Sequence, residues 1–156
     1  MSDRSALLEE ISSMLLDSDL FSHLSPAELR AAHYFGVNKI AEDEVIFNEG
    51  DIGLFMCIVH SGSIAVIKAN QNEELVEMVK LGHGRAFGEM AVLDGERRSA
   101  TCRAAEDSIL LTLSKEALDK MLEEHPRIAA RVIRAIAVSL SRRLRMAVGQ
   151  LVDHIV

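Results

Sequence analysis

The residues best suited to chemistry lie in one short stretch, residues 87–101. Gly88 has no side chain, so a ligand can approach the backbone closely at this point. The carboxylate of Glu89 beside it can accept hydrogen bonds from two hydroxyl groups. After a short turn, Arg98 supplies a guanidinium fork, and a hydroxyl and further backbone N–H groups follow it directly.

This combination has the chemistry of a sugar-phosphate clamp. A guanidinium fork together with N–H groups suits a phosphate, and a carboxylate on the opposite side suits the hydroxyls of a ribose. A single Glu or Arg is usually a solvated surface charge, but the joint spacing of these groups favours ligand binding. The alternative is a degenerate pocket that keeps the fold and holds no ligand.

The N-terminal zone that must support this stretch, residues 1–36, is predicted to be helical. Apolar residues recur at helical spacing from Leu7 to Leu15. A second helix is predicted to begin at Ser25-Pro26-Ala27-Glu28, where Ser25 and Glu28 have the spacing of a capping box. Because Glu9 and Glu10 interrupt the apolar residues, we expect no signal peptide.

The middle zone, residues 37–113, is predicted to be β-structure. Seven of the nine glycines fall between Gly50 and Gly95, and β-rich runs lie between the turns that they form. Short strands at this spacing indicate a sandwich or a barrel-like roll instead of βαβ units. The expected strands are Glu44–Phe47, Leu54–His60, Ser63–Lys68, Leu75–Leu81, Thr101–Ala104 and Ser108–Leu113.

The last zone, residues 114–156, is predicted to be a helix pair. Ser114 can cap a helix over residues 115–124, and Pro126 opens a long helix that reaches at least Met146. This helix carries a heptad-like apolar seam, which either packs on the β-roll or pairs with a second copy of the chain. We favour a homodimer. The seam consists of Ile133, Ile136, Leu140, Leu144, Val148, Leu151 and Ile155.

The stretch 87–101 resembles the phosphate-binding cassette of cyclic nucleotide-binding domains. This family includes catabolite activator proteins, regulatory subunits of cAMP-dependent kinase and cyclic-nucleotide-gated channels. A second signature of the family fits the segment from Glu49-Gly50-Asp51 to Ser61-Gly62-Ser63-Ile64-Ala65-Val66. The resemblance implies one mainly β domain over residues 1–156, a jelly-roll-like β-roll (double-stranded β-helix) with N-terminal helices and a C-terminal helix pair. The cassette matches at Phe87, Gly88, Glu89, Ala91, Leu93, Arg98, Ser99, Ala100 and Thr101.

The resemblance also implies roles for these residues. Glu89 and the Gly88 N–H would hold the ribose 2′-hydroxyl, and Arg98 would pair with the cyclic phosphate. Apolar packing to the base would come from the Leu81-Gly82 turn and from Ile64 and Val66. The choice between adenine and guanine stays open. The remaining candidate ligand-binding residues of the cassette are Phe87, Met90, Ala91, Ser99, Ala100 and Thr101.

Other groups of residues give weaker signals. Five arginines share one side of the long helix, and the net charge of 17 − 24 = −7 favours a solvated face over contact with nucleic acid. The six histidines have no paired metal spacing along the chain, and we expect no metal and no catalytic group. The arginines are Arg127, Arg131, Arg134, Arg142 and Arg145.

Taken together, these features predict a non-enzymatic sensor of cAMP or cGMP. We expect no further cofactor. We also expect no membrane contact, because the apolar runs are far shorter than the roughly 18 residues that a membrane span needs.

With two cysteines, the chain fits the reducing cytoplasm. Ligand occupancy would pass through the C-terminal helices to an unknown effector protein. The alternatives are a dimerisation module without ligand and a transcriptional regulator that uses the arginine face; the latter lacks a helix-turn-helix.

Overall fold

The computed structural model describes residues 3–155, with side chains described as far as residue 151. Strands occupy the middle of the chain and helices both ends. In chain order the elements are α1 (Asp3–Leu16), the 3-10 helix η1 (Glu28–Tyr34), β1 (Gly36–Ile40), β2 (Val45–Phe47), β3 (Phe55–Ser61), β4 (Ile64–Ala69), β5 (Leu75–Leu81), β6 (Ala86–Phe87), α2 (Glu89–Asp94), β7 (Thr101–Ala104), β8 (Ser108–Ser114), α3 (Lys115–Glu124) and α4 (Pro126–Ile155).

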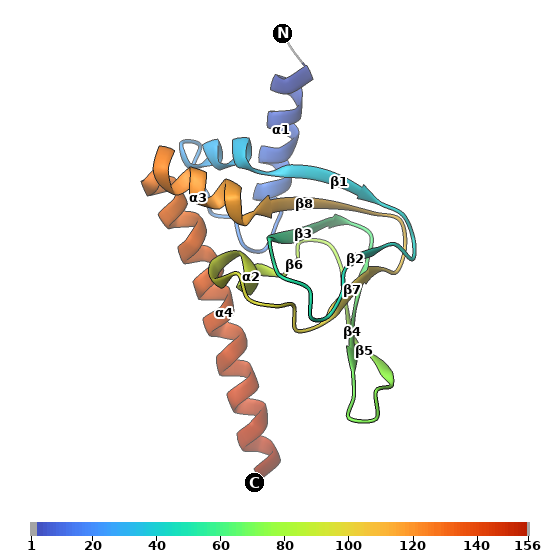
Figure 1. Ribbon diagram of the computed structural model, residues 1–156. Helices are drawn as coiled ribbons and strands as arrows, with labels where there is room; N and C mark the ends of the chain where they lie inside the picture. The colour runs from blue at the N-terminus through green and yellow to red at the C-terminus, as the bar shows by residue number, and fades with distance from the viewer. Residues whose placement is uncertain (1–2, 156) are drawn as a thin grey trace.

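The strands form two antiparallel sheets that face each other. One sheet has the order β1-β8-β3-β6 and the other β2-β7-β4-β5. Their inner faces enclose a core of aliphatic residues, two thiols and phenylalanines, which includes Val59, Ile64, Leu110 and Cys102. The predicted fold class is confirmed: this is a mainly β roll with N-terminal helices and a C-terminal helix pair (Figure 1).

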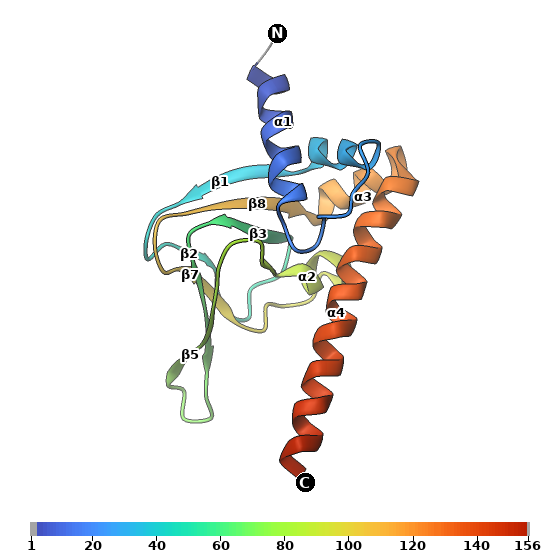
Figure 2. The same ribbon diagram turned by 180° about the vertical axis from the view of Figure 1, so that it is seen from behind.

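A second core lies on the outer face of the first sheet. Helices α1, η1, α3 and the first half of α4 gather over this face, as Figure 2 shows from behind. Leu15, Phe21, Met121 and Ile136 are at most 1% exposed in this layer. Burial of such side chains contributes about 1.5–3 kcal/mol each, which fixes the helices on the roll.

Strand β3 separates the two cores. Successive side chains of a strand point to opposite faces, so Met56 and Ile58 pack among the helices while Cys57 and Val59 face the other sheet. All four residues are at most 1% exposed. This explains why the segment reads as a continuous apolar run instead of an alternating one.

Three local features differ from the expectation. Strand β1 was not predicted, because its sequence GVNKI mixes polar and apolar residues and lies at a sheet edge. Strand β6 was not predicted either, because it has only two residues. The segment after Ser25 forms the 3-10 helix η1 from Glu28 onward, although the capping-box hydrogen bonds between Ser25 and Glu28 are present at 2.9 and 3.3 Å.

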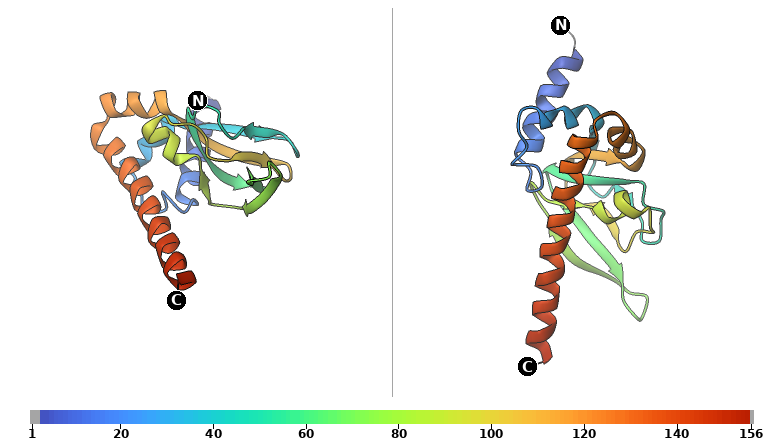
Figure 3. Two further views of the ribbon diagram at one scale, coloured as in Figure 1. Left: turned by 60° about the horizontal axis from the view of Figure 1, so that its bottom comes forward. Right: turned by 90° about the vertical axis from the view of Figure 1, so that its left-hand side faces the viewer.

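Helix α4 has an attached half and a projecting half. Ile136 is fully buried and Leu140 packs against the helical core, whereas the apolar positions that follow are exposed. Figure 3 shows the second half continuing beyond the roll. Ile155, the last position of the predicted seam, lies outside the residues whose side chains are described. In residues 3–155, none of the helices combines the length and the apolar character needed to cross a bilayer.

Candidate functional site

Residues from the predicted cassette surround a cavity of about 370 Å³ beside the second sheet. Val66, Val79 and Leu81 from β4 and β5 form its apolar wall, and Arg143 of α4 closes another side. Eight of the nine predicted site residues line the cavity, and their contact with a ligand remains a prediction. They are Phe87, Gly88, Glu89, Met90, Ala91, Arg98, Ser99 and Ala100.

Two expected residues lie elsewhere. The hydroxyl of Thr101 accepts a hydrogen bond from the Glu49 N–H at 2.8 Å, which ties β7 to the loop after β2. Ile64 is fully buried in the core between the sheets, while Val66 on the same strand reaches the cavity. Thr101 therefore supports the cassette from outside, and the apolar wall begins at Val66.

The guanidinium of Arg98 is the central charge of the site, and it is almost completely buried, with 5% of the residue exposed. Its Nη1 donates to the Gly88 carbonyl at 3.1 Å and its Nη2 to the Phe55 carbonyl at 2.5 Å. The group also lies over the ring of Phe47, 3.8 Å from its centroid, a favourable cation–π contact.

The positive charge of Arg98 has no acidic partner among the ion pairs of residues 3–151, and its Nε has no hydrogen-bond partner there. Burial lowers the pKa of this guanidinium, which nevertheless remains protonated. A buried charge without a counter-ion is costly, and an anion in the cavity would offset that cost.

The neighbouring thiols do not neutralise Arg98. Cys57 and Cys102 are both free and buried. Burial raises the pKa of the Cys102 thiol to about 12 and that of Cys57 further, although the charge of Arg98 opposes both shifts. Both side chains are therefore neutral thiols at physiological pH.

Gly88 is required by the position of Arg98. Its φ of +74° lies in the left-handed region, which side chains other than glycine rarely adopt. A Cβ atom at this position would lie 2.6 Å from Nη1 of Arg98 and 3.3 Å from the Phe55 carbonyl. The sequence predicted the close approach of a ligand at this glycine, whereas the group that approaches it in the structure is the guanidinium of Arg98.

The loop before β3 holds the other side of the cassette. The Arg98 N–H donates to the Asp51 carbonyl at 2.7 Å, and the Gly50 N–H donates to the Arg98 carbonyl at 2.8 Å. Lys68 Nζ donates to the Ser99 carbonyl at 2.7 Å. Among the hydrogen bonds of the described residues, the N–H groups of Ser99 and Ala100 have no protein acceptor, so they are available to a ligand at the cavity wall.

Glu89 provides the opposite charge. It begins α2 and is only 2% exposed, and its Oε1 forms an ion pair with Arg143 of α4. Burial lowers the pKa of Arg143, and the nearby charge of Arg85 lowers it further. Sequence analysis missed Arg143: it is not part of the predicted arginine face, and only the packing of α4 across the roll brings it to Glu89.

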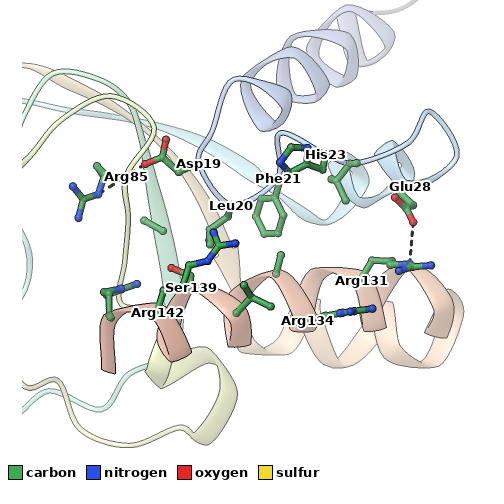
Figure 4. Close-up of a pocket in the computed structure, with 15 residues that line it drawn as sticks. Asp19, Leu20, Phe21, His23, Glu28, Arg85, Arg131, Arg134, Ser139 and Arg142 are labelled. Carbon is green, nitrogen blue, oxygen red and sulfur yellow. Dashed lines mark ion pairs between the residues drawn. The ribbon is translucent and has the colours of Figure 1, made fainter. Parts of the chain in front are cut away.

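A second, larger cavity of about 590 Å³ lies between α4 and the segment that joins α1 to η1 (Figure 4). Arg131, Arg134 and Arg142 of the predicted arginine face line it. Arg131 pairs with Glu28 at 3.2 Å, as the dashed line in Figure 4 marks. This part of the face therefore lies beside the chain's own N-terminal segment, although all five arginines remain exposed to solvent.

The chain is similar in sequence to known cyclic nucleotide-binding proteins. Residues 37–125 match the model of the cyclic nucleotide-binding domain. The cyclic AMP receptor protein of Thermus thermophilus is 34% identical over 131 residues, which are 83% of this chain and 59% of the relative. The cAMP-dependent protein kinase regulatory subunit of Blastocladiella emersonii is 32% identical over 75% of this chain and 28% of the relative. This chain thus spans less than two thirds of both relatives.

A solved structure agrees with these sequence matches. The crystal structure of a cyclic nucleotide-binding domain from Methylobacillus flagellatus superposes with a TM-score of 0.80 at 28% identity. The alignment covers 94% of this chain and 83% of the other. The similarity therefore includes the flanking helices as well as the roll.

The substitution Gly88→Ala is expected to destabilise the fold by about 1–3 kcal/mol, because it combines a strained φ with a clash against Arg98. Denaturant titration measures this change. Gly149→Ala is the matched control: it adds the same methyl group to helix α4, where nothing lies within 4 Å, and should stabilise the chain by up to about 1 kcal/mol. Equal effects of the two substitutions would contradict the assigned role of Gly88.

Proposed function

Because the chain belongs to the cyclic nucleotide-binding domain family, we propose that residues 1–156 form one regulatory domain that binds cAMP or cGMP in the 370 Å³ cavity. One observation supports this assignment above all others. The buried guanidinium of Arg98 lies at the cavity wall without an acidic partner in residues 3–151. A single cyclic phosphate would supply the missing negative charge.

The other groups of the cavity fit the rest of such a ligand. The hydroxyl of Ser99 and the N–H groups of Ser99 and Ala100 would donate to phosphate oxygens beside Arg98. Glu89 would accept a hydrogen bond from the ribose 2′-hydroxyl across the cavity. The base would lie against the apolar wall that contains Val66 and Leu81. The side chains of Val66, Val79 and Leu81 carry no polar group that would distinguish adenine from guanine.

Ligand binding would reach helix α4 through a competition for Glu89. In the structure Glu89 is paired with Arg143. A ribose hydroxyl that donates to the same carboxylate weakens this pair and releases the hold of α2 on α4. Such a ligand has different affinities for the attached and the released position of α4, which is the condition for a conformational response.

We assign no enzymatic activity to this domain, because the proposed chemistry of the cavity is reversible binding. Two of its relatives are named as a receptor protein and a kinase regulatory subunit, and this chain covers only 6–9% of the relatives that are named lysophospholipases. Two buried free thiols fit a reducing compartment, so the cytoplasm is the proposed location. The effector that reads the position of α4 would be a separate protein or a further segment.

The projecting half of α4 supports a homodimer. Four large apolar residues on it are more than half exposed, which is unusual for a helix in water and leaves an apolar strip for a partner. The heptad-like spacing of most of them suits the same helix of a second copy. The residues are Leu144 (66% exposed), Met146 (66%), Val148 (52%) and Leu151 (60%).

The first prediction concerns Arg98. Calorimetric titration of the chain with cAMP and with cGMP should show one site, and Arg98→Ala should weaken binding by about 10- to 150-fold. This range corresponds to the roughly 1.5–3 kcal/mol of a hydrogen bond to a charged group. Arg127→Ala is the control, because Arg127 is exposed at the start of α4 and does not line the cavity.

Since Arg98 also supports the fold, circular dichroism should first establish that the variant is folded. Ser99→Ala tests the same subsite without removing a buried charge, and should weaken binding several-fold. A folded chain that binds neither nucleotide, or Arg98→Ala and Ser99→Ala variants that bind as tightly as the unmodified chain, would refute the proposed site.

The second prediction concerns Arg143. Arg143→Ala removes the competitor for Glu89, so the affinity for the nucleotide should rise about fivefold, the equivalent of roughly 1 kcal/mol. The neighbouring Arg142→Ala leaves the ion pair intact and serves as the control in the same titration. Weaker binding by Arg143→Ala would show that Arg143 holds the ligand instead of competing with it.

The third prediction concerns the strip on α4. Light scattering after size exclusion should show a dimer, and the double variant Leu144→Glu, Val148→Glu should be monomeric because carboxylates are costly in an apolar seam. Gln150→Glu adds a charge to the same end of the helix away from these positions and should leave the dimer intact. A monomeric unmodified chain would rule the homodimer out.

A further inference from the structure

Three potential metal ligands from distant parts of the chain meet on the surface of the roll. Asp17 follows α1, His60 lies in β3, and His83 lies in the turn between β5 and β6. One ligand atom from each lies within 4.8 Å of the other two. The histidines are 23 residues apart, which is why their spacing in the sequence suggests no metal site, whereas the fold makes them neighbours.

The ring of His83 is held in the orientation that a metal ligand requires. Its Nδ1 lies 2.6 Å from the His60 carbonyl oxygen, which can only accept a hydrogen bond, so Nδ1 carries the proton. When the ring is protonated, its Nε2 donates to Oδ2 of Asp17, 3.0 Å away, in an ion pair. A metal ion would replace this proton and bind both atoms, while Nδ1 keeps its hydrogen bond to the carbonyl, as is typical of metal-binding histidines.

The backbone around these residues is fixed by hydrogen bonds between the elements that carry them. The Val59 N–H, next to His60, donates to the Arg85 carbonyl at 2.8 Å, and the Gly84 N–H donates to the Val59 carbonyl at 2.7 Å. The Asp19 N–H donates to the Gly84 carbonyl at 3.0 Å, which docks the segment after α1 on the same turn. Three elements are therefore held in place before any ion arrives.

The adjacent charges leave the site accessible to a cation. Arg85 is paired with Asp19 at 3.9 Å instead of with Asp17. Asp17 and His83 are exposed and His60 is half-buried, so an ion can enter from solvent and keep water as a further ligand. None of the three residues lines the 370 Å³ cavity, which makes this location separate from the proposed nucleotide site.

We propose that Asp17, His60 and His83 bind a first-row divalent transition-metal ion, with Zn²⁺ as the representative. Two imidazoles and one carboxylate suit Zn²⁺ and its neighbours, whereas Ca²⁺ and Mg²⁺ prefer oxygen ligands alone. With metal–ligand distances of about 2.0–2.2 Å, tetrahedral ligand atoms lie about 3.3 Å apart. Asp17 and His83 are already close to this separation, and rotation of the His60 ring would bring in the third ligand.

Calorimetric titration of the untagged chain with ZnCl₂, after treatment with a chelator, tests the proposal. We expect one ion per chain, with affinity reduced at least about 10-fold in His60→Ala and in His83→Ala. His33→Ala is the matched control, because it removes an exposed histidine from η1, a different element, and should bind like the unmodified chain. The same titration with MgCl₂ should show no binding at this site.

Co²⁺ provides a second readout that does not depend on affinity alone. Its visible absorption reports imidazole ligands, and the spectrum of the unmodified chain should be lost in His83→Gln, which retains a side chain of similar size. Circular dichroism checks that each variant is folded. Absence of stoichiometric Zn²⁺ binding, or equal binding by His60→Ala, His83→Ala and the unmodified chain, would overturn the proposal.

Discussion

The buried guanidinium of Arg98 is the constraint on which the rest of the site depends. Two backbone carbonyls and the ring of Phe47 hold it, yet no residue among 3–151 forms an ion pair with it. Its position in turn requires the positive φ of Gly88 and the paired loop before β3. The roll thus maintains a fixed positive charge at a cavity wall, and a bound anion would complete its partners.

Glu89 and Arg143 form a complementary arrangement on the other side of the cavity. Glu89 is as deeply buried as Arg98, but its partner comes from the long C-terminal helix instead of from the roll. The positive charge of Arg98 is therefore held by the roll, whereas the positive charge that pairs with Glu89 belongs to helix α4. In the proposed function, this division would anchor one half of the ligand at Arg98 while the other half competes with Arg143 for Glu89.

The sequence alone predicted the features that depend on local patterns. The cassette around Gly88, the helix cap at Ser114 and most strands follow from residue type and spacing, and the Ser114 side chain does accept from the Ala117 N–H at 2.9 Å. The contact of Arg143 and the meeting of His60 with His83 could not be predicted in this way. Both depend on how elements far apart in the chain pack together, which no periodicity records.

Strand β3 gives the architecture a mechanical property. One face of this strand packs against the helices and the other face packs in the core of the roll. The carbonyl of its first residue, Phe55, accepts a hydrogen bond from Arg98. Close-packed interiors transmit displacement instead of absorbing it. A rearrangement among the helices is therefore transmitted through the backbone of β3 to the guanidinium of Arg98. A change in the packing of one layer also changes the other.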